Sequence, residues 1–191
     1  MAMKKAQKAA AHVKSAAKKV ATKAAKVAKK VSAKAQPIPA GYHILTPSIV
    51  VRGAAEAIEF YKKAFGAKEK YRMGGPGGKI MHAEIKIGDS ILMLADEIPE
   101  MGNKSPQSYG GSGSSILIYT KNVDALFQQA VAAGAKPVMP VGDQFWGDRY
   151  GQVTDPYGHV WQLATRKENL TPKQMAKRAV AAFSGPPPQQ S

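Results

Sequence analysis

Residues 155–163 read DPYGHVWQL, a tight turn that leads into a short apolar strand. The proline fixes its own φ angle, and the glycine supplies the positive φ that a tight reversal needs. The β-branched and aromatic residues that follow favour a strand over 160–164. Because strand side chains alternate, Gln162 faces away from Trp161 and Leu163. Gln162 is the only polar side chain in this strand, so it lies either at a solvated edge or in a cleft.

The same pattern occurs earlier in the chain. Residues 88–95 read GDSILMLA, again a turn followed by an apolar strand. Its last two residues match Leu163 and Ala164 at an offset of 69, and the helical segments upstream match at an offset of 68. An internal repeat of this length predicts two tandem copies of one supersecondary unit.

Each copy reads as strand, helix and three strands, from its periodicity and from its glycine and proline breaks. A further helix is predicted from Thr171-Pro172, an N-cap followed by a first-turn proline, to about Phe183. The predicted fold class is α+β, with two tandem βαβββ modules forming a curved mixed sheet with an open cleft. A basic helical or disordered N-terminal tail and a C-terminal helix flank it. The predicted elements are strand 44–52, helix 54–65 and strands 68–73, 79–87 and 90–95, then strand 114–120, helix 123–133 and strands 136–141, 150–154 and 160–164.

The composition divides the chain into three parts. Residues 1–36 hold 11 Lys and no acid, whereas residues 37–165 hold 12 bases and 12 acids. The predicted domains are the tail 1–36, a folded domain 37–166 with modules 41–97 and 112–166, and a helix with a proline-rich end over 167–191. The sequence has no Cys, which excludes disulfides, cysteine zinc sites and thiolate nucleophiles. No apolar run is long enough to span a membrane, and a cytoplasmic or nucleoid-associated location is expected.

The tail carries Val and Ala at steps of three and four, with Lys on the other faces. We expect it to gain helix when a polyanion neutralises its charges, and to bind nucleic acid without sequence preference. A solubilising extension is the alternative, and a mitochondrial presequence is disfavoured by the lack of Arg. The tail resembles the Ala/Lys repeats of linker-histone tails. The predicted phosphate contacts are Lys14, Lys18, Lys19, Lys23, Lys26, Lys29, Lys30 and Lys34.

The folded domain resembles the vicinal-oxygen-chelate superfamily, which includes glyoxalase I, extradiol dioxygenases, and fosfomycin- and bleomycin-resistance proteins. The resemblance lies in the two βαβββ modules and in the Asp-Pro-x-Gly strand at residues 155–163. Further segments resemble its PhnB-like, or 3-demethylubiquinone methyltransferase-like, branch. These are residues 47–65, 81–89, 105–106 and 143–149 and the Thr171-Pro172 helix. The resemblance covers about residues 40–180 and implies a homodimer, since cups in this superfamily are commonly completed across a two-fold axis.

Metal-dependent members of this superfamily use one ligand from the first and one from the last strand of each module. Carried over, these positions fall at Thr46, Met93, Ser115 and Gln162, and only Gln162 is a residue type that those members use. One amide with two hydroxyls and a thioether is inadequate for a hard divalent ion. We therefore expect no metal at this site and no other cofactor.

Six residues are predicted to line the cleft and bind a small molecule: His82, Glu84, Met93, Trp146, Arg149 and Gln162. His82 and Glu84 lie two apart on the polar face of one strand, as an acid–base pair or two ligands of a displaced metal site would. The alternative is a satisfied polar face or a hydrogen bond at the sheet rim. Trp146 and Arg149 lie in a loop and suit a planar or anionic ligand, or a lid packed on the second module.

Three functional hypotheses follow. The first is a metal-independent small-molecule-binding protein of the bleomycin-resistance type, carried on a nucleic-acid-binding tail. The second is a lyase, isomerase or dioxygenase that uses a displaced site around His82 and Glu84. The third is a nucleoid-associated protein whose folded domain serves only for dimerisation. No catalytic residue is assigned, because no Ser-His-Asp order, phosphate loop or paired-carboxylate motif is present.

Overall fold

The computed structural model describes residues 35–184. The predicted tail helix and its eight candidate lysines lie outside the described residues, as does the chain after residue 184. Residues from Gly41 onward form one compact unit, which holds every element named below. Within the described part of the chain, no helix is both long and apolar enough to cross a bilayer.

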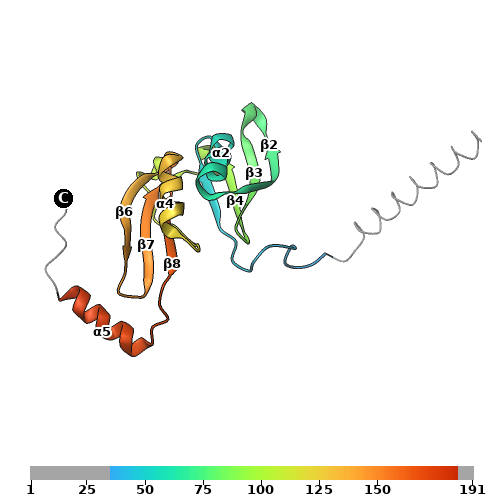
Figure 1. Ribbon diagram of the computed structural model, residues 1–191. Coiled ribbons are helices and arrows are strands. Elements are labelled where there is room, and N and C mark those ends of the chain that lie inside the picture. Colours follow the sequence, from blue (N-terminus) through green and yellow to red (C-terminus); the bar gives the residue numbers. More distant parts are fainter. Residues whose placement is uncertain (1–34, 185–191) are drawn as a thin grey trace, which may run out of the picture. The chain divides into compact units, whose positions relative to one another are not determined.

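The fold is α+β, as predicted, and each half of it repeats the order βαβββ. Two 3-10 turns and a short helix lie in the loops, and a longer helix follows the second module (Figure 1). The first module consists of β1 (Ser48–Val51), α2 (Ala54–Phe65), β2 (Lys68–Gly74), η1 (Pro76–Gly78), β3 (Ile80–Ile87) and β4 (Ser90–Asp96). The connector holds η2 (Pro99–Met101) and α3 (Pro106–Tyr109). The second module consists of β5 (Ser115–Tyr119), α4 (Val123–Ala132), β6 (Lys136–Asp143), β7 (Asp148–Thr154) and β8 (Val160–Arg166), and α5 (Pro172–Phe183) ends the described chain.

Each module builds its own four-stranded mixed sheet, in the orders β1-β4-β3-β2 and β5-β8-β7-β6. In both sheets the first strand pairs in parallel with the last, and the other pairs are antiparallel. Ser48 pairs with Met93 in the first sheet, and Leu117 pairs with Gln162 in the second. These pairs are 69 residues apart, so the strand register reproduces the sequence repeat. The sequence predicts a curved mixed sheet, and the structure divides it into two sheets in which β1 and β5 are edge strands.

One helix layer serves both sheets. The rings of Tyr61 and Phe65 on α2 lie 5.4 and 4.6 Å from the ring of Trp161 on β8. On α4, the Gln129 side chain donates to the backbone carbonyl of Lys63 at 2.8 Å. Because α2 touches the same face of β8 that carries Trp161, both sheets turn their other faces away from this layer. We call those faces the open faces.

Alternation along the strands sorts side chains between the helix layer and the open faces. On β3, Ala83 and Ile85 are fully buried under α2, whereas His82 and Glu84 lie on the open face and are partly exposed. On β8, Trp161 and Leu163 are buried. The face assignments predicted for β3 and β8 are therefore confirmed.

The Asp155 carboxylate joins the two modules. Its Oδ2 accepts from the Tyr61 hydroxyl of α2 at 2.7 Å and from the Trp161 indole nitrogen at 2.8 Å. Its Oδ1 accepts from the backbone N–H groups of Tyr157 and His159, both at 2.9 Å, and so closes the turn before β8. Burial, followed by the nearby Asp155 charge, raises the pKa of Tyr61 well above its usual value. Four donors from three parts of the chain therefore converge on one buried carboxylate.

A second carboxylate, Glu97, fixes the connector. Its Oε2 accepts from the Ser105 hydroxyl, the Ser105 N–H and the Ser108 hydroxyl, each at 2.6 Å. Its Oε1 accepts from Arg52 Nε at 3.0 Å. These donors, with the Ser105 and Ser108 hydroxyls first, lower the pKa of Glu97 to about 2.

The Tyr61–Asp155 contact is tested by replacing Tyr61 with Phe. The change removes one hydrogen bond to a buried carboxylate, and we expect the free energy of unfolding to fall by about 1.5–3 kcal/mol. Asp155→Ala should cost more, because it leaves four donors without their acceptor. Urea unfolding measures both, with Tyr157→Phe as the control because the Tyr157 hydroxyl has no hydrogen-bond partner among the described residues. Equal unfolding midpoints for Tyr61→Phe and the parent protein would contradict this assignment.

The Glu97 contact predicts a pH dependence of stability. The pKa of Glu97 is about 2 in the folded protein and has an ordinary value of 4.5, so the folded state favours its ionised form. The stabilisation is complete above the ordinary value and is lost as the pH falls through the folded value. We expect the stability difference between the parent protein and Glu97→Gln to shrink steadily over that acidic range. Urea unfolding at a series of pH values measures this, and a difference independent of pH would refute the prediction.

Candidate functional site

The open face of the first module carries a compact group of polar, aromatic and thioether side chains. Tyr71 on β2 and Met93 on β4 are the direct cross-strand neighbours of Glu84 on β3. The rings of Tyr71 and His82 lie 6.1 Å apart. We call Tyr42, Tyr71, His82, Glu84 and Met93 the open-face cluster.

Glu84 is the electrostatic centre of this cluster. Its Oε1 lies 3.3 Å from His82 Nε2, and Tyr42 is near enough to the same carboxylate for each group to shift the pKa of the other. These contacts, with Tyr42 first and a further contribution from the charge of Lys70, lower the pKa of Glu84. The Glu84 carboxylate in turn raises the pKa of Tyr42 to about 12. Glu84 is therefore ionised, and Tyr42 protonated, at neutral pH.

The open face of the second module carries neutral counterparts at the repeated positions. Gln152 is the cross-strand neighbour of Gln162, as Glu84 is of Met93. The Gln152 amide donates to the Tyr150 hydroxyl at 2.6 Å, and the Gln162 amide donates to the Ser115 hydroxyl at 2.7 Å. Both modules therefore carry a polar pair on the strand before the last, His82 and Glu84 on β3 and Tyr150 and Gln152 on β7. Only the pair of the first module includes a carboxylate.

The positions that hold metal in metal-dependent vicinal-oxygen-chelate proteins do not suit a divalent ion here. The Thr46 hydroxyl donates to the His43 carbonyl at 2.9 Å, and Ser115 and Gln162 bond to each other. Met93 offers a soft thioether, and hard divalent ions prefer carboxylate and carbonyl oxygen. No group of three or more His, Cys, Asp or Glu side chains within residues 35–184 is arranged to hold a metal.

Arg149 points away from the open faces, whereas Trp146 packs against Tyr150, which lies on the open face of the second module beside Gln152. Strand β7 begins at Asp148, before the predicted Tyr150, and its alternation turns Arg149 toward α4. There Arg149 donates to Asp124 through Nη2 at 2.7 Å and Nε at 2.8 Å, and to Asp143 through Nη1 at 3.1 Å. The Trp146 ring packs edge-on against Tyr150, 5.6 Å between centroids. The guanidinium is thus committed to two carboxylates, and it is not brought together with His82, Glu84 or Met93.

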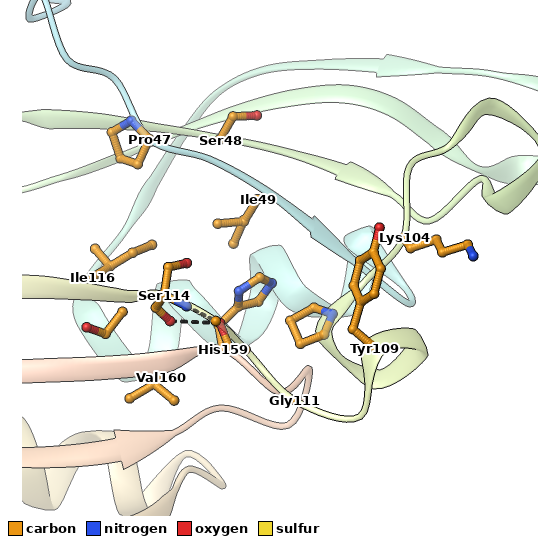
Figure 2. Close-up of a pocket in the computed structure, with 14 residues that line it drawn as sticks. Pro47, Ser48, Ile49, Lys104, Tyr109, Gly111, Ser114, Ile116, His159 and Val160 are labelled. Atoms are coloured by element: carbon orange, nitrogen blue, oxygen red, sulfur yellow. Dashed lines mark hydrogen bonds between the residues drawn. The ribbon is translucent and has the colours of Figure 1, made fainter.

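Two cavities lie along the seam between the free edges of β1 and β5. The first has a volume of about 330 Å³. Figure 2 shows it with Tyr109 and Lys104 of the connector on one side and Ser114 and Ile116 on the other. His159 Nε2 lies 3.0 Å from the Val50 carbonyl, so this ring nitrogen donates across the seam. His159 therefore holds the two modules together at this cavity.

The second cavity, which we call the seam cavity, has a volume of about 550 Å³. Its walls are mainly apolar and aromatic, with a few polar groups at Asp89, Ser90 and Thr120. The apolar lining includes Leu45, Phe65, Ile91, Leu117, Leu126 and Trp161. A volume of this size with mostly apolar walls and a few polar groups is typical of small-molecule sites.

The structure therefore groups the six candidate residues only in part: it brings His82, Glu84 and Met93 together and turns Arg149 toward α4. His82, Glu84, Met93 and Gln162 lie on the open faces, and none of the six lines either cavity described above. Whether the four share one concavity stays a prediction. Sequence reasoning missed Tyr42, which precedes β1, and the seam cavity, whose walls come from both modules. No local pattern marks either feature.

Comparison with known proteins identifies the fold and close relatives. The family model of the Glyoxalase/Bleomycin resistance protein/Dioxygenase superfamily matches residues 42–163. An uncharacterized protein of Mycobacterium bovis is 47% identical over 137 residues, which cover 69% of this chain and 90% of that protein. An uncharacterized protein of Arabidopsis thaliana is 31% identical over 123 residues, which cover 61% of this chain and 74% of that protein.

Solved structures show the same architecture. TioX from Micromonospora sp. ML1 has a TM-score of 0.51 and 26% identity, and the match covers 64% of this chain and 97% of TioX. The fosfomycin resistance protein FosX from Listeria monocytogenes, solved with Mn(II), has a TM-score of 0.51 over 72% of this chain and 97% of FosX. At 18% identity, this second match shows the fold alone.

Proposed function

The chain belongs to the Glyoxalase/Bleomycin resistance protein/Dioxygenase superfamily, and within it we propose that this protein binds a small organic molecule without a metal ion. The observation that carries the proposal is the seam cavity of about 550 Å³ with its apolar and aromatic walls. Apolar walls supply most of the binding free energy for such ligands, and the few polar groups orient them. His82, Glu84, Met93 and Gln162 line neither cavity, and on the open faces they offer a ligand a second surface.

The chemistry of the metal positions supports binding over metal-assisted catalysis. A hard ion at Ser115 and Gln162 would have to break their mutual hydrogen bond and would gain only neutral oxygen ligands. The lyase, isomerase or dioxygenase hypothesis would need a displaced site, and His82 with Glu84 supplies only two candidate ligands. We assign the protein to the PhnB-like branch on the sequence segments already named.

We further propose that two copies associate. Large apolar side chains are exposed just before β1 and on α5. Ile44 and Leu45 are 93% and 87% exposed, and Val180 and Phe183 are 68% and 78% exposed. A second copy that covers them would remove this apolar surface from water.

Ligand binding is tested by native mass spectrometry of the full-length protein after incubation with a low-molecular-mass cell extract. We expect a non-covalent organic adduct and no stoichiometric divalent metal, and the same spectrum gives the mass of the assembly. Leu117→Trp fills the seam cavity from a side chain that is already 43% exposed, so it should abolish the adduct without disturbing the core. Val138→Trp is the control, because Val138 is 55% exposed and lines neither cavity. An adduct that persists in Leu117→Trp, or one metal ion per chain, would contradict the proposal.

The tail supports a second function, nucleic-acid binding without sequence preference. Eleven Lys and no acid in 1–36 form a polycation, whereas 37–165 is electrically neutral. Lys contacts to phosphate release counterions and carry no base information. The tail would thus tether a neutral binding domain to nucleic acid, and it would locate the protein at the nucleoid.

A salt titration on an arbitrary DNA duplex tests the tail. If about six lysines engage phosphates, affinity should fall by roughly three orders of magnitude between about 50 and 200 mM salt. A chain lacking 1–36 should not bind, and a full-length chain with the eight candidate lysines changed to Gln separates charge from length. Equal binding by all three proteins, or a flat salt dependence, would show that the tail only solubilises.

A further inference from the structure

Glu84 is a carboxylate that forms no ion pair with Lys or Arg among the described residues. Its side chain is 21% exposed, and its only ion-pair partner among the described residues is His82, at 3.3 Å. Glu69, Glu97 and Asp124, by contrast, pair with Arg or Lys at 2.7–3.0 Å. The neighbouring Tyr42 hydroxyl is protonated at neutral pH and leaves the charge of Glu84 in place. A carboxylate of this kind gains most from a cation that arrives with a ligand.

The neighbours of Glu84 suit the organic part of such a cation. Tyr71 is directly opposite Glu84 and is 50% exposed, so the face of its ring is accessible. Met93 flanks Glu84 on the other side, and Met73, 45% exposed, lies opposite His82. An aromatic ring attracts a cation through its quadrupole, and thioethers adapt to irregular alkyl groups.

The protonation states favour binding over proton transfer. Hydrogen bonds from Tyr42 and His82 lower the pKa of Glu84, which makes it a weak base at neutral pH. The pKa of Tyr42 is raised to about 12, so its hydroxyl remains a donor. The group therefore presents a fixed negative charge and fixed donors.

We propose that the open-face cluster binds an organic cation, with Glu84 contacting the ammonium group and Tyr71 and Met93 contacting its carbon substituents. The ligand class is an amine or quaternary ammonium compound that carries an apolar or aromatic group. This site is separate from the seam cavity. The proposed function requires only that a small organic molecule binds, whereas a ligand of this site carries a positive charge.

The second module provides an internal comparison. Gln152 occupies the position that repeats Glu84, and it donates to Tyr150 where Glu84 contacts His82. Glu84→Gln therefore makes the first module resemble the second in charge. Lys70 is exposed and its charge acts on Glu84, so Lys70→Gln should strengthen the attraction for a cation.

The experiment titrates full-length protein, labelled with ¹³C at the methionine methyl groups, with three probes of similar size. Benzyltrimethylammonium is a permanent cation, benzyl alcohol is neutral, and benzenesulfonate is a permanent anion. The methyl signals of Met73 and Met93, assigned by Met→Leu variants, report binding at this face alone. The Lys-rich tail therefore does not obscure the result for the anion.

We expect the cation to bind roughly five times more tightly than the neutral probe, because an exposed ion pair and a cation–π contact each add to its binding free energy. Glu84→Gln should remove the ion-pair part of this preference and leave only the weaker cation–π part, and Lys70→Gln should increase the preference. Glu100→Gln, at an exposed acid on η2, should leave it unchanged.

Three outcomes would overturn the inference. Equal affinity for the three probes in the parent protein would show that the face has no charge preference, and small-molecule binding in the seam cavity would still stand. A cation preference of undiminished size in Glu84→Gln would show that Glu84 does not contribute to it. If no probe shifts Met73 or Met93, the cluster is not a binding site.

Discussion

The buried carboxylate of Asp155 is the interaction on which the arrangement of this domain depends. It accepts from Tyr61 in the first module and from Trp161 in the second, and it closes the turn between β7 and β8. Because the turn and the contact between modules share one acceptor, the position of β8 is fixed relative to α2. That position sends Trp161 into the helix layer and leaves Gln162 on the open face. A single side chain thereby links the local turn to the placement of the candidate site.

The duplicated architecture explains why the two open faces resemble each other in geometry and differ in chemistry. The parallel pairs Ser48–Met93 and Leu117–Gln162 are related by the same offset, so the backbone of each module presents equivalent positions. Backbone register depends on the buried faces of the strands, which both modules fill with apolar residues. The open faces carry no such constraint. Glu84 in one module and Gln152 in the other therefore occupy equivalent places with different charge.

Much of the fold could be predicted from the sequence because local signals agree with one another. The helix predicted over 54–65 is α2 without a change of bounds, since its apolar spacing and its terminal Gly66 both define it. The face of His82 and Glu84 followed from alternation alone. The sequence analysis predicted a loop at Arg149, because no local signal shows that β7 starts at Asp148. In the structure Arg149 belongs to β7, and the alternation of that strand points its side chain toward Asp124. Tyr42 and the seam cavity depend on contacts between distant segments, which periodicity does not encode.

The residues at the four metal positions show that this chain shares the fold of the metal-dependent superfamily members without sharing their metal ligands. Metal-dependent members of the superfamily concentrate charge and ligands where the two modules meet the cleft. In this chain Ser115 and Gln162 satisfy each other, Thr46 bonds to its own loop, and Met93 contributes only a soft thioether. The ionised group on the open faces next to these positions is Glu84, which lies beside a tyrosine and a histidine. An ionised carboxylate without a Lys or Arg partner attracts positive charge from a ligand.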